Sequence, residues 1–205
     1  MPRQPDNKSE TRNRILRRLY DMPYEIRRQK DAAIEGRLLS MPEFTGAKSV
    51  MLYASFRCEV STRNLISHCL SLGIKTGLPR VMKKEGRLRI FEIRYMSELT
   101  PGFRGIPEPA ESDEREMGLE ELDIVIVPGV AFDPSLNRLG HGTGYYDRLL
   151  GSVRKIDAAG CARARPLFVG LAYEEQTVPS LYCGPYDIKM DAVITDKRML
   201  IENGQ

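Results

Sequence analysis

Short apolar runs alternate with helix-like segments along most of this chain. Strand-like runs stand at residues 49–55, 123–129, 167–173 and 191–196, and helix-like segments precede, separate or follow them. Two parallel strands can be neighbours only if a long crossover joins them, and a helix usually supplies that crossover. The alternation therefore predicts an α/β fold with a mostly parallel central sheet and helices on both faces.

Local signals predict where several elements begin and end. Residues 8–20 carry Ile15, Leu16 and Leu19 on one helical face, and Pro23 interrupts before a second helix to about residue 39. The helix that follows the first strand is expected to start at Ser61, as its N-cap, and to stop at Gly73. A further helix is expected over residues 145–158.

Two more segments complete the expected fold. "KTGLPRVM" and "LRIFEI" predict two strands joined by a tight turn at "KKEG", where Gly86 supplies a permissive backbone. Residues 97–121 are rich in proline, glycine and acidic side chains, and we interpret them as an irregular surface connection within one domain that spans residues 1–205.

Composition excludes several classes of protein. Hydrophobic residues make up 41% of the chain and charged residues 29%, and no apolar run approaches the roughly 20 residues that span a bilayer. A secretory signal is absent, so we expect a cytoplasmic protein without membrane contacts. The net charge of +3 does not indicate nucleic acid as a partner. Four cysteines lie far apart without a CxxC pair, which favours reduced thiols: Cys58, Cys69, Cys161 and Cys183.

The segment "NRLGHGTGYYDRLL" at residues 137–150 is the clearest candidate for a binding site. Gly140, Gly142 and Gly144 can adopt backbone angles closed to other residues, which lets successive N–H groups face one concavity. The start of the next helix and Arg138 add positive potential, so phosphate is the expected guest. The spacing matches neither a Walker loop nor a Rossmann fingerprint. The alternative is a tight strand-to-helix loop whose glycines only relieve crowding.

Five segments, in order along the chain, carry a resemblance to a known family. They are "KSETR" at 8–12, "YASFRCEVST" at 53–62, "FRGIPEP" at 103–109, "PGVAFDPSLNRLGHGTGYYDRLL" at 128–150 and "YDIKMDAVIT" at 186–195. Together they resemble the 5-formyltetrahydrofolate cyclo-ligase family, also called methenyltetrahydrofolate synthetases. The resemblance implies an α/β sandwich related to the ribose-5-phosphate isomerase and CoA-transferase folds, with ATP and a reduced folate as substrates and Mg²⁺ as cofactor.

The implied reaction is an ATP-dependent ring closure. The formyl group on N5 of the folate is an amide and a poor electrophile, so the family transfers the γ-phosphoryl of ATP to the formyl oxygen. N10 then attacks the activated carbon, and loss of phosphate leaves 5,10-methenyltetrahydrofolate and ADP. Such a transfer asks the protein mainly for alignment and charge stabilisation.

The resemblance also implies roles for individual residues. ATP would be held by Lys8 and Arg12 and by the stretch Arg138, Leu139, Gly140, His141, Gly142, Thr143, Gly144, Tyr145 and Tyr146. The catalytic positions would be Arg138, His141 and Tyr145. The folate would meet Ala54, Glu59, His141 and Tyr145. Mg²⁺ would bind Asp147 and Asp187, which are hard oxygen ligands for a hard cation.

Simpler interpretations stay open for several of these residues. Lys8 and Arg12 can form a solvated basic face. Asp147 can be a favourable first-turn carboxylate and Asp187 a turn residue, while the two tyrosines can pack into the core.

The chain also departs from the family pattern. His141 replaces a usual arginine, Thr143 a usual glycine or lysine, and Thr11 a usual leucine. A folate-binding protein without turnover, and a phosphosugar- or CoA-handling enzyme that shares only the fold, are therefore the alternative functions.

Overall fold

The computed structural model describes residues 7–152 and 165–201 of the chain. The α-helices in this part are α1 (Lys8–Tyr20), α2 (Tyr24–Leu39), α3 (Pro42–Thr45), α4 (Arg63–Ser71) and α5 (Tyr145–Gly151). The longer strands are β1 (Ser49–Met51), β2 (Lys75–Met82), β3 (Arg87–Ile93), β7 (Ile124–Val127), β10 (Leu167–Ala172), β11 (Ala192–Thr195) and β12 (Met199–Ile201). The two-residue strands are β4 (Thr100–Pro101), β5 (Pro107–Glu108), β6 (Glu116–Met117), β8 (Ala131–Phe132) and β9 (Arg138–Leu139).

One eight-stranded sheet organises the molecule, in the order β12-β11-β10-β7-β1-β2-β3-β6. The pairings from β11 through β10, β7 and β1 to β2 are all parallel, whereas β12, β3 and β6 pair antiparallel at the two sides. The predicted mostly parallel sheet is therefore confirmed. From β1 the chain moves to β2 on one side and later returns to β7 on the other, so the strand order reverses at β1 and β7.

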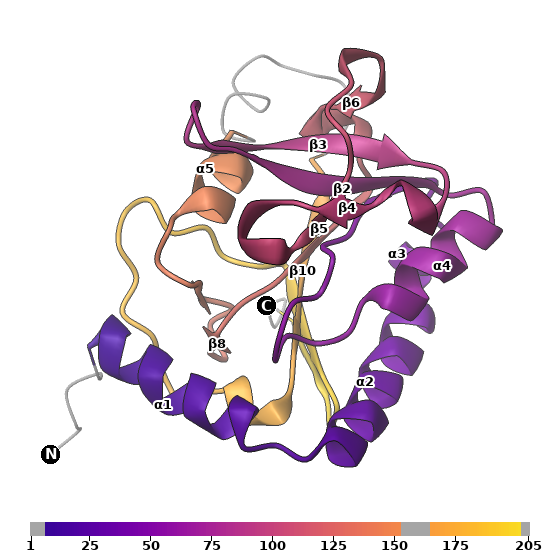
Figure 1. The fold of residues 1–205 in the computed structure, drawn as a ribbon. Coiled ribbons are helices and arrows are strands. Elements are labelled where there is room, and N and C mark those ends of the chain that lie inside the picture. The colour runs from indigo at the N-terminus through magenta and orange to yellow at the C-terminus, as the bar shows by residue number, and fades with distance from the viewer. Residues whose placement is uncertain (1–6, 153–164, 202–205) are drawn as a thin grey trace, which may run out of the picture.

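Both faces of the sheet are packed, because successive side chains of a strand point to opposite faces. On β7, Ile124 and Ile126 join one buried cluster, while Val125 and Val127 join the other. The first cluster includes side chains of α1, α2 and α4, and the second includes Leu150 of α5. Figure 1 shows α2 and α4 along one side of the sheet and α5 on the opposite side, as the alternation of strands and helices predicts.

Some predicted boundaries are wrong by a residue or more. The N-cap of α4 is Thr62 and not Ser61: the Thr62 carbonyl accepts the Ile66 N–H, while the Thr62 hydroxyl donates to the Tyr53 carbonyl and does not cap the helix. Gly73, just beyond the helix, has a φ of +69°, which confirms it as the stop. Of the helix predicted over 145–158, α5 accounts for 145–151, and residues 153–158 lie outside the described part.

The segment 97–121 is irregular, as predicted, but it is more than a surface connection. It contains β4, β5 and β6, and β6 extends the main sheet beyond β3. Met117 and Leu119 are buried in the core beside β3. The proline and glycine content indicated the irregular backbone but gave no sign of this packing.

Among the helices of residues 7–152 and 165–201, none combines the length and the apolar character that a membrane crossing requires.

Candidate active site

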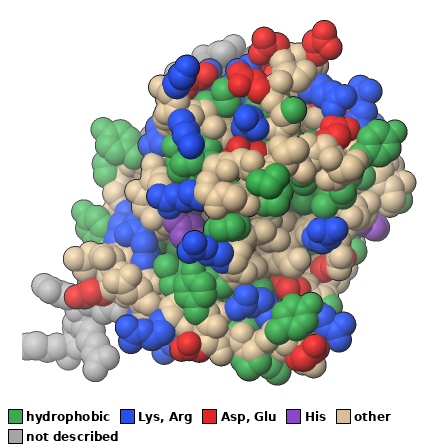
Figure 2. Space-filling view, in the orientation of Figure 1, with side chains coloured by type: hydrophobic (Ala, Val, Ile, Leu, Met, Phe, Trp, Pro, Cys, Tyr) green, Lys and Arg blue, Asp and Glu red, His purple; other side chains and the backbone are tan. Residues whose placement is uncertain are grey.

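A cavity of about 500 Å³ opens beyond the carboxyl ends of β1 and β7. The segment after β1 forms one wall and the segment after β7 forms another, so the cavity lies where the strand order reverses. Open α/β sheets bind ligands at such a reversal, because the two connections there leave in opposite directions and a crevice remains between them. Every residue that the sequence analysis assigned to ATP, folate or metal lines this cavity. Figure 2 shows Lys and Arg side chains gathered around a histidine on the face in view.

Helix α1 brings two cations to the cavity from one side. Arg12 donates from Nε to the Gly140 carbonyl at 2.7 Å, which ties α1 to the glycine loop of residues 140–144. Lys8, one turn earlier, places Nζ 2.6 Å from Oδ2 of Asp187. The helix starts at Asn7, whose side chain accepts from the Ser9 N–H as an N-cap. Lys8 and Arg12 therefore have specific partners and are not a solvated basic face.

The glycine loop has the expected shape at two of its three glycines. Gly142 and Gly144 have φ values of +96° and +68°, which side-chain-bearing residues rarely adopt. Gly140 does not have a positive φ, so the prediction of a special backbone angle is wrong there. A Cβ at Gly140 would lie 3.0 Å from Nη1 of Arg138, and the glycine therefore makes room for that side chain.

Arg138 is the buried charge of the site. Its side chain is 3% exposed, and Nη2 donates to Oδ1 of Asp147 at 2.6 Å while Nη1 donates to the Pro128 carbonyl at 3.2 Å. Its Nε–H is buried without an acceptor among the described residues. Arg138 thus joins the end of β7 to the first turn of α5, and Asp147 is held as its partner.

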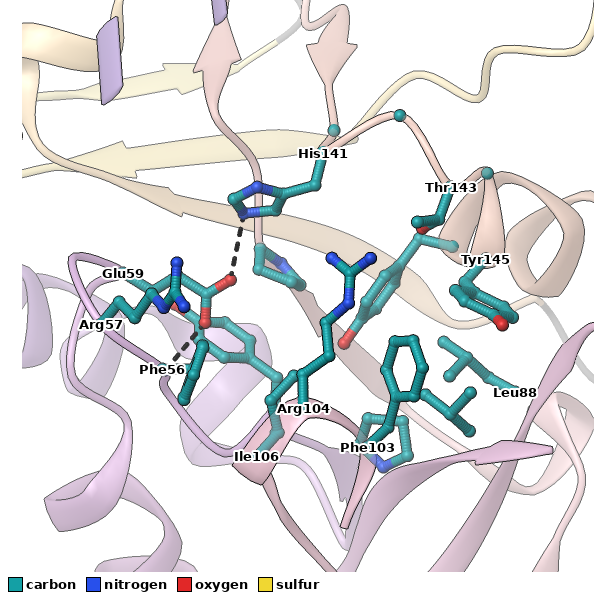
Figure 3. A pocket seen from close by; sticks show the side chains of 18 of the residues that line it. Phe56, Arg57, Glu59, Leu88, Phe103, Arg104, Ile106, His141, Thr143 and Tyr145 are labelled. Carbon is teal, nitrogen blue, oxygen red and sulfur yellow. Dashed lines mark hydrogen bonds and ion pairs between the residues drawn. The ribbon is translucent and has the colours of Figure 1, made fainter. Parts of the chain in front are cut away.

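Glu59 and His141 meet across the cavity. Glu59 accepts the backbone N–H of Phe56 at 2.9 Å through Oε2, and Nε2 of His141 lies 3.5 Å from Oε1 of the same carboxylate, as Figure 3 shows. Ala54 lines the same wall. The carboxylate therefore keeps one oxygen on its own loop and turns the other toward the glycine loop.

The two tyrosines after the glycine loop have different surroundings. Tyr145 packs edge to face against Phe103, with ring centroids 6.2 Å apart, and also lines the cavity. Burial, with the nearby Glu59 carboxylate, raises the pKa of the Tyr146 hydroxyl despite the opposing Arg138 charge. The Tyr146 hydroxyl therefore keeps its proton at neutral pH and can donate a hydrogen bond.

Several residues that line the cavity or support its loops were given no role from the sequence. Phe103, Arg104 and Ile106 come from the segment that the sequence shows only as an ordered match to the family. Arg57 lies beside Glu59. Arg148 braces the loop, since it donates to the carbonyls of Thr143 and Gly86. An arginine four residues after a loop glycine is a common helix residue, so nothing in the sequence marked it.

The two carboxylates Asp147 and Asp187 fit a magnesium site in their chemistry. Mg²⁺ usually binds one or two carboxylates and completes its shell with water and phosphate oxygens. Both carboxylates are partly exposed to the same cavity, with 25% and 22% of their side-chain surface accessible. Within the described ranges no group of three or more metal-ligating side chains occurs. A cation here would therefore complete its shell with water and with the oxygens of a phosphorylated ligand.

The fold and the cavity together define an α/β enzyme with a cation-rich pocket at the carboxyl edge of a mostly parallel sheet. The model of the 5-formyltetrahydrofolate cyclo-ligase family matches residues 4–196. The chain belongs to this family.

Individual relatives agree with the family match. The chain is 34% identical over 201 residues to the mitochondrial 5-formyltetrahydrofolate cyclo-ligase of Arabidopsis thaliana, an alignment that covers 90% of this chain and 72% of the relative. It is 31% identical to the cyclo-ligase of Escherichia coli over 80% of this chain and 86% of that one. The NMR structure of Aquifex aeolicus 5,10-methenyltetrahydrofolate synthetase superimposes with a TM-score of 0.81 at 33% identity, covering 97% of this chain and 94% of that one.

Proposed function

We propose that this protein converts 5-formyltetrahydrofolate to 5,10-methenyltetrahydrofolate with ATP, releasing ADP and phosphate. One observation carries the proposal. A single cavity is lined on one side by Lys8, Arg12 and the glycine loop, and on the other by Glu59. A phosphoryl donor and a folate can therefore meet there.

The phosphate side of the cavity would bind and align ATP. Arg12 already holds the Gly140 carbonyl, so a phosphate bound against its remaining N–H groups would be fixed relative to the loop. Backbone N–H groups of the loop would complete the contact, as glycine-rich nests do for anions. Phosphoryl transfer spreads negative charge over the phosphate oxygens, and hydrogen-bond donors that are already oriented stabilise this charge most effectively.

The folate side would orient the formyl group. Glu59 can accept an N–H donor of a pterin edge through Oε1, the oxygen that faces the cavity. Tyr146 is near both Glu59 and Arg138 and keeps its proton. These groups would hold the formyl oxygen in line with the γ-phosphoryl, and N10 would close the ring after transfer.

Mg²⁺, when bound by Asp147 and Asp187, would neutralise charge on the phosphates. Release of these two carboxylates from Arg138 and Lys8 would leave two cations free to contact the same phosphates. We include in this proposal the binding of Mg²⁺, the roles given above to individual residues and a cytoplasmic location.

The test is turnover. Purified protein, MgATP and 5-formyltetrahydrofolate are mixed, and the ultraviolet absorbance of the methenyl product is followed. Arg12→Gln should lower the rate at least tenfold at subsaturating ATP, because hydrogen bonds to charged groups contribute about 1.5–3 kcal/mol. Arg18→Gln, on the exposed side of the same helix, should stay within about twofold of wild type, as substitutions outside such networks usually do.

Two results would count against the proposal. Binding of the folate without formation of the methenyl product would favour a folate-binding protein. Failure to bind either ligand would favour a protein that shares only the fold.

A further inference from the structure

Asp133 is a buried carboxylate that has no part in the proposed reaction. It is 2% exposed, stands between β8 and β9, and does not line the cavity. Within residues 7–152 and 165–201 no lysine or arginine forms an ion pair with it, and N–H groups surround it instead. Oδ1 accepts the backbone N–H groups of Ser135 and Asn137, both at 3.0 Å, and Oδ2 accepts the Asn137 side-chain amide at 2.9 Å and the Leu181 backbone N–H at 2.8 Å. A buried charge is unfavourable unless such contacts compensate it, so this position is built to hold a carboxylate.

Three of these four contacts stay within the turn of residues 133–137. Aspartate side chains commonly close such turns by accepting N–H groups that follow them in the chain. Leu136 in this turn has a left-handed backbone, with a φ of +63°, a conformation that persists only where its surroundings hold it. The fourth donor, Leu181, is 48 residues further along the chain. Its contact therefore joins the turn to a distant stretch of residues 177–190, which we call the Asp187 segment.

Backbone contacts attach the Asp187 segment to the same hairpin, which β8 and β9 form. The N–H of Val178 donates to the Phe132 carbonyl, and the N–H of Met190 donates to the Leu136 carbonyl, both at 2.9 Å. Asp187 lies between these two attachment points in the chain. Of the three attachments, the one described above is made by a side chain, so a substitution can remove it without changing the backbone.

The hairpin also leads to the other carboxylate assigned to the metal. Strand β9 carries Arg138, whose Nη2 lies 2.6 Å from Oδ1 of Asp147. Helix α1 lies beside the hairpin (Figure 1), and its Lys8 binds Asp187. Mg²⁺ requires near-ideal octahedral geometry at short distances, so two carboxylates that share this ion have to be held at a defined separation. The hairpin is placed to set that separation, because both carboxylates are attached through it.

We propose, on the basis of the proposed function, that Asp133 is a positioning residue for the magnesium site. By accepting the Leu181 N–H, it holds the Asp187 segment on the hairpin, so that Asp187 and Asp147 reach the same cation on the ATP phosphates. Groups that orient metal ligands without touching the ion commonly change metal affinity about 10- to 100-fold when they are removed. Asp133 therefore acts on the binding of the metal and leaves the binding of metal-free nucleotide unchanged.

Asp133→Asn breaks this attachment selectively. Its amide oxygen can still accept the two backbone N–H groups of the turn, whereas its amide nitrogen donates and cannot accept the Leu181 N–H. The Asn137 amide can turn around to accept the new N–H, because Asn137 Oδ1 is buried without a partner among the described residues. If Asp133→Asn does not fold, Asp133→Ser replaces it, since a serine hydroxyl can close the turn but is too short to reach Leu181.

Calorimetry with a non-hydrolysable ATP analogue, AMPPNP, tests the proposal without turnover. The affinity is measured with Mg²⁺ and again with EDTA, and the ratio of the two affinities is the gain from the metal. This gain should fall about tenfold in Asp133→Asn, whereas the affinity in EDTA should stay within about twofold of wild type. Asp123→Asn is the matched control. Asp123 accepts the backbone N–H groups of Lys48 and Ser49 at 2.8 and 2.9 Å and does not line the cavity, so its variant should keep the full gain.

A double variant separates positioning from a general effect on stability. Because Asp133 acts through Asp187, Asp133→Asn/Asp187→Asn should show the same gain from the metal as Asp187→Asn alone, whereas independent effects would add. Turnover by Asp133→Asn should also recover toward the wild-type rate at high Mg²⁺, which a damaged fold would not allow.

A wild-type gain in Asp133→Asn would overturn the proposal. So would an equal loss of affinity with Mg²⁺ and with EDTA, or a double variant whose loss is the sum of the two single losses in free energy. If wild type itself shows no gain from Mg²⁺, this proposal and the magnesium assignment both fail, whereas turnover of the folate still decides the proposed function.

Discussion

The two aspartates predicted to bind metal each hold a cation of the protein. Asp147 is bound to Arg138, and Asp187 to Lys8. Burial raises the pKa of Asp187. The hydrogen bonds from Lys8 and the Gly184 N–H, together with the Lys8 and Arg138 charges, lower the pKa by a larger amount, so the net pKa is below its usual value. Asp187 is therefore charged at neutral pH and able to exchange Lys8 for a metal.

Replacing either aspartate with asparagine tests this exchange. Asp147→Asn and Asp187→Asn keep the side-chain shape but remove the charge that a cation needs, so each should raise the Mg²⁺ concentration required for half-maximal turnover by about tenfold or more, as loss of a charged ligand contact predicts. Asp113→Asn, at a 91% exposed side chain outside the cavity, is the matched control. Turnover close to wild type at limiting Mg²⁺ in both variants would remove these residues from the metal site.

Contacts between individual side chains of the site could not be predicted from the sequence. The ordered family segments indicated Glu59 and His141, but nothing in the chain showed that the two side chains lie 3.5 Å apart. Such a contact depends on how two loops fold over the sheet. The role of Gly140 could not be predicted for the same reason: this glycine leaves room for the Arg138 side chain, and its own backbone angle does not require glycine.

At the scale of elements, the junction between the glycine loop and α5 sets the site. Gly144 is the N-cap of α5 with a φ of +68°, and Arg148 of the same helix donates to the Thr143 carbonyl. The loop and the helix therefore hold each other, and Asp147 in the first turn is directed at Arg138.

Gly144→Ala should weaken this junction. An added Cβ would lie 2.9 Å from Nη1 of Arg148, and alanine resists a positive φ, so the expected loss of unfolding free energy is about 1 kcal/mol or more. ATP affinity should fall as well, because the loop would shift. Gly151→Ala in the same helix is the control: nothing lies within 4 Å of its added Cβ, and it should be neutral or stabilising by up to about 1 kcal/mol. Equal melting temperatures for the two variants would contradict this account of the loop.

The alternation of strands and helices was enough to predict the parallel centre of the sheet. The antiparallel pair of β2 and β3 was also predicted, from the tight turn at "KKEG", but the short strands of the segment 97–121 were not. The strands β4, β5 and β6 have two residues each, which is too short for a hydrophobic pattern to mark them. β6 pairs with β3, whereas β4 and β5 pair with each other, and the turn between β4 and β5 carries Phe103 and Arg104 to the cavity.

Across the whole molecule, a partly buried charge cluster ties α2 to the end of β11. Lys30 Nζ lies 2.7 Å from Oδ2 of Asp196 and 2.9 Å from Oε1 of Glu175. Burial lowers the pKa of Lys30, but hydrogen bonds to the two carboxylates raise it more, and the net pKa is above its usual 10.5. Burial raises the pKa of Asp196, but the hydrogen bonds from Lys30 and the Glu174 N–H bring the net pKa below its usual 3.8.

Lys30→Met should lower the free energy of unfolding by about 2 kcal/mol, because it leaves the partly buried Asp196 carboxylate without its charged partner. Lys75→Met, which removes a partly exposed pair with Glu121, should cost less than about 1 kcal/mol. Denaturant unfolding measures both. A similar loss of unfolding free energy in the two variants would show that the Lys30 cluster stabilises the fold no more than an exposed ion pair does.

The pH dependence of the Lys30 contribution follows from the two shifts. A lowered aspartate pKa stabilises the fold above pH 3.8, and this is lost as the pH falls through the folded value of Asp196. A raised lysine pKa stabilises it fully below pH 10.5, and this is lost as the pH rises through the folded value of Lys30. The difference in unfolding free energy between wild type and Lys30→Met should therefore not change with pH between pH 3.8 and pH 10.5.

If ATP and the folate meet in one cavity as proposed, the γ-phosphoryl of ATP reaches the formyl oxygen of the folate. The most direct measurement uses 5-formyltetrahydrofolate labelled with ¹⁸O in the formyl group, with MgATP and the wild-type protein. We expect the label in inorganic phosphate, one ¹⁸O atom for each methenyl product formed, because the formyl oxygen leaves with the phosphoryl group. Methenyl product accompanied by unlabelled phosphate, with the ¹⁸O in water, would contradict it.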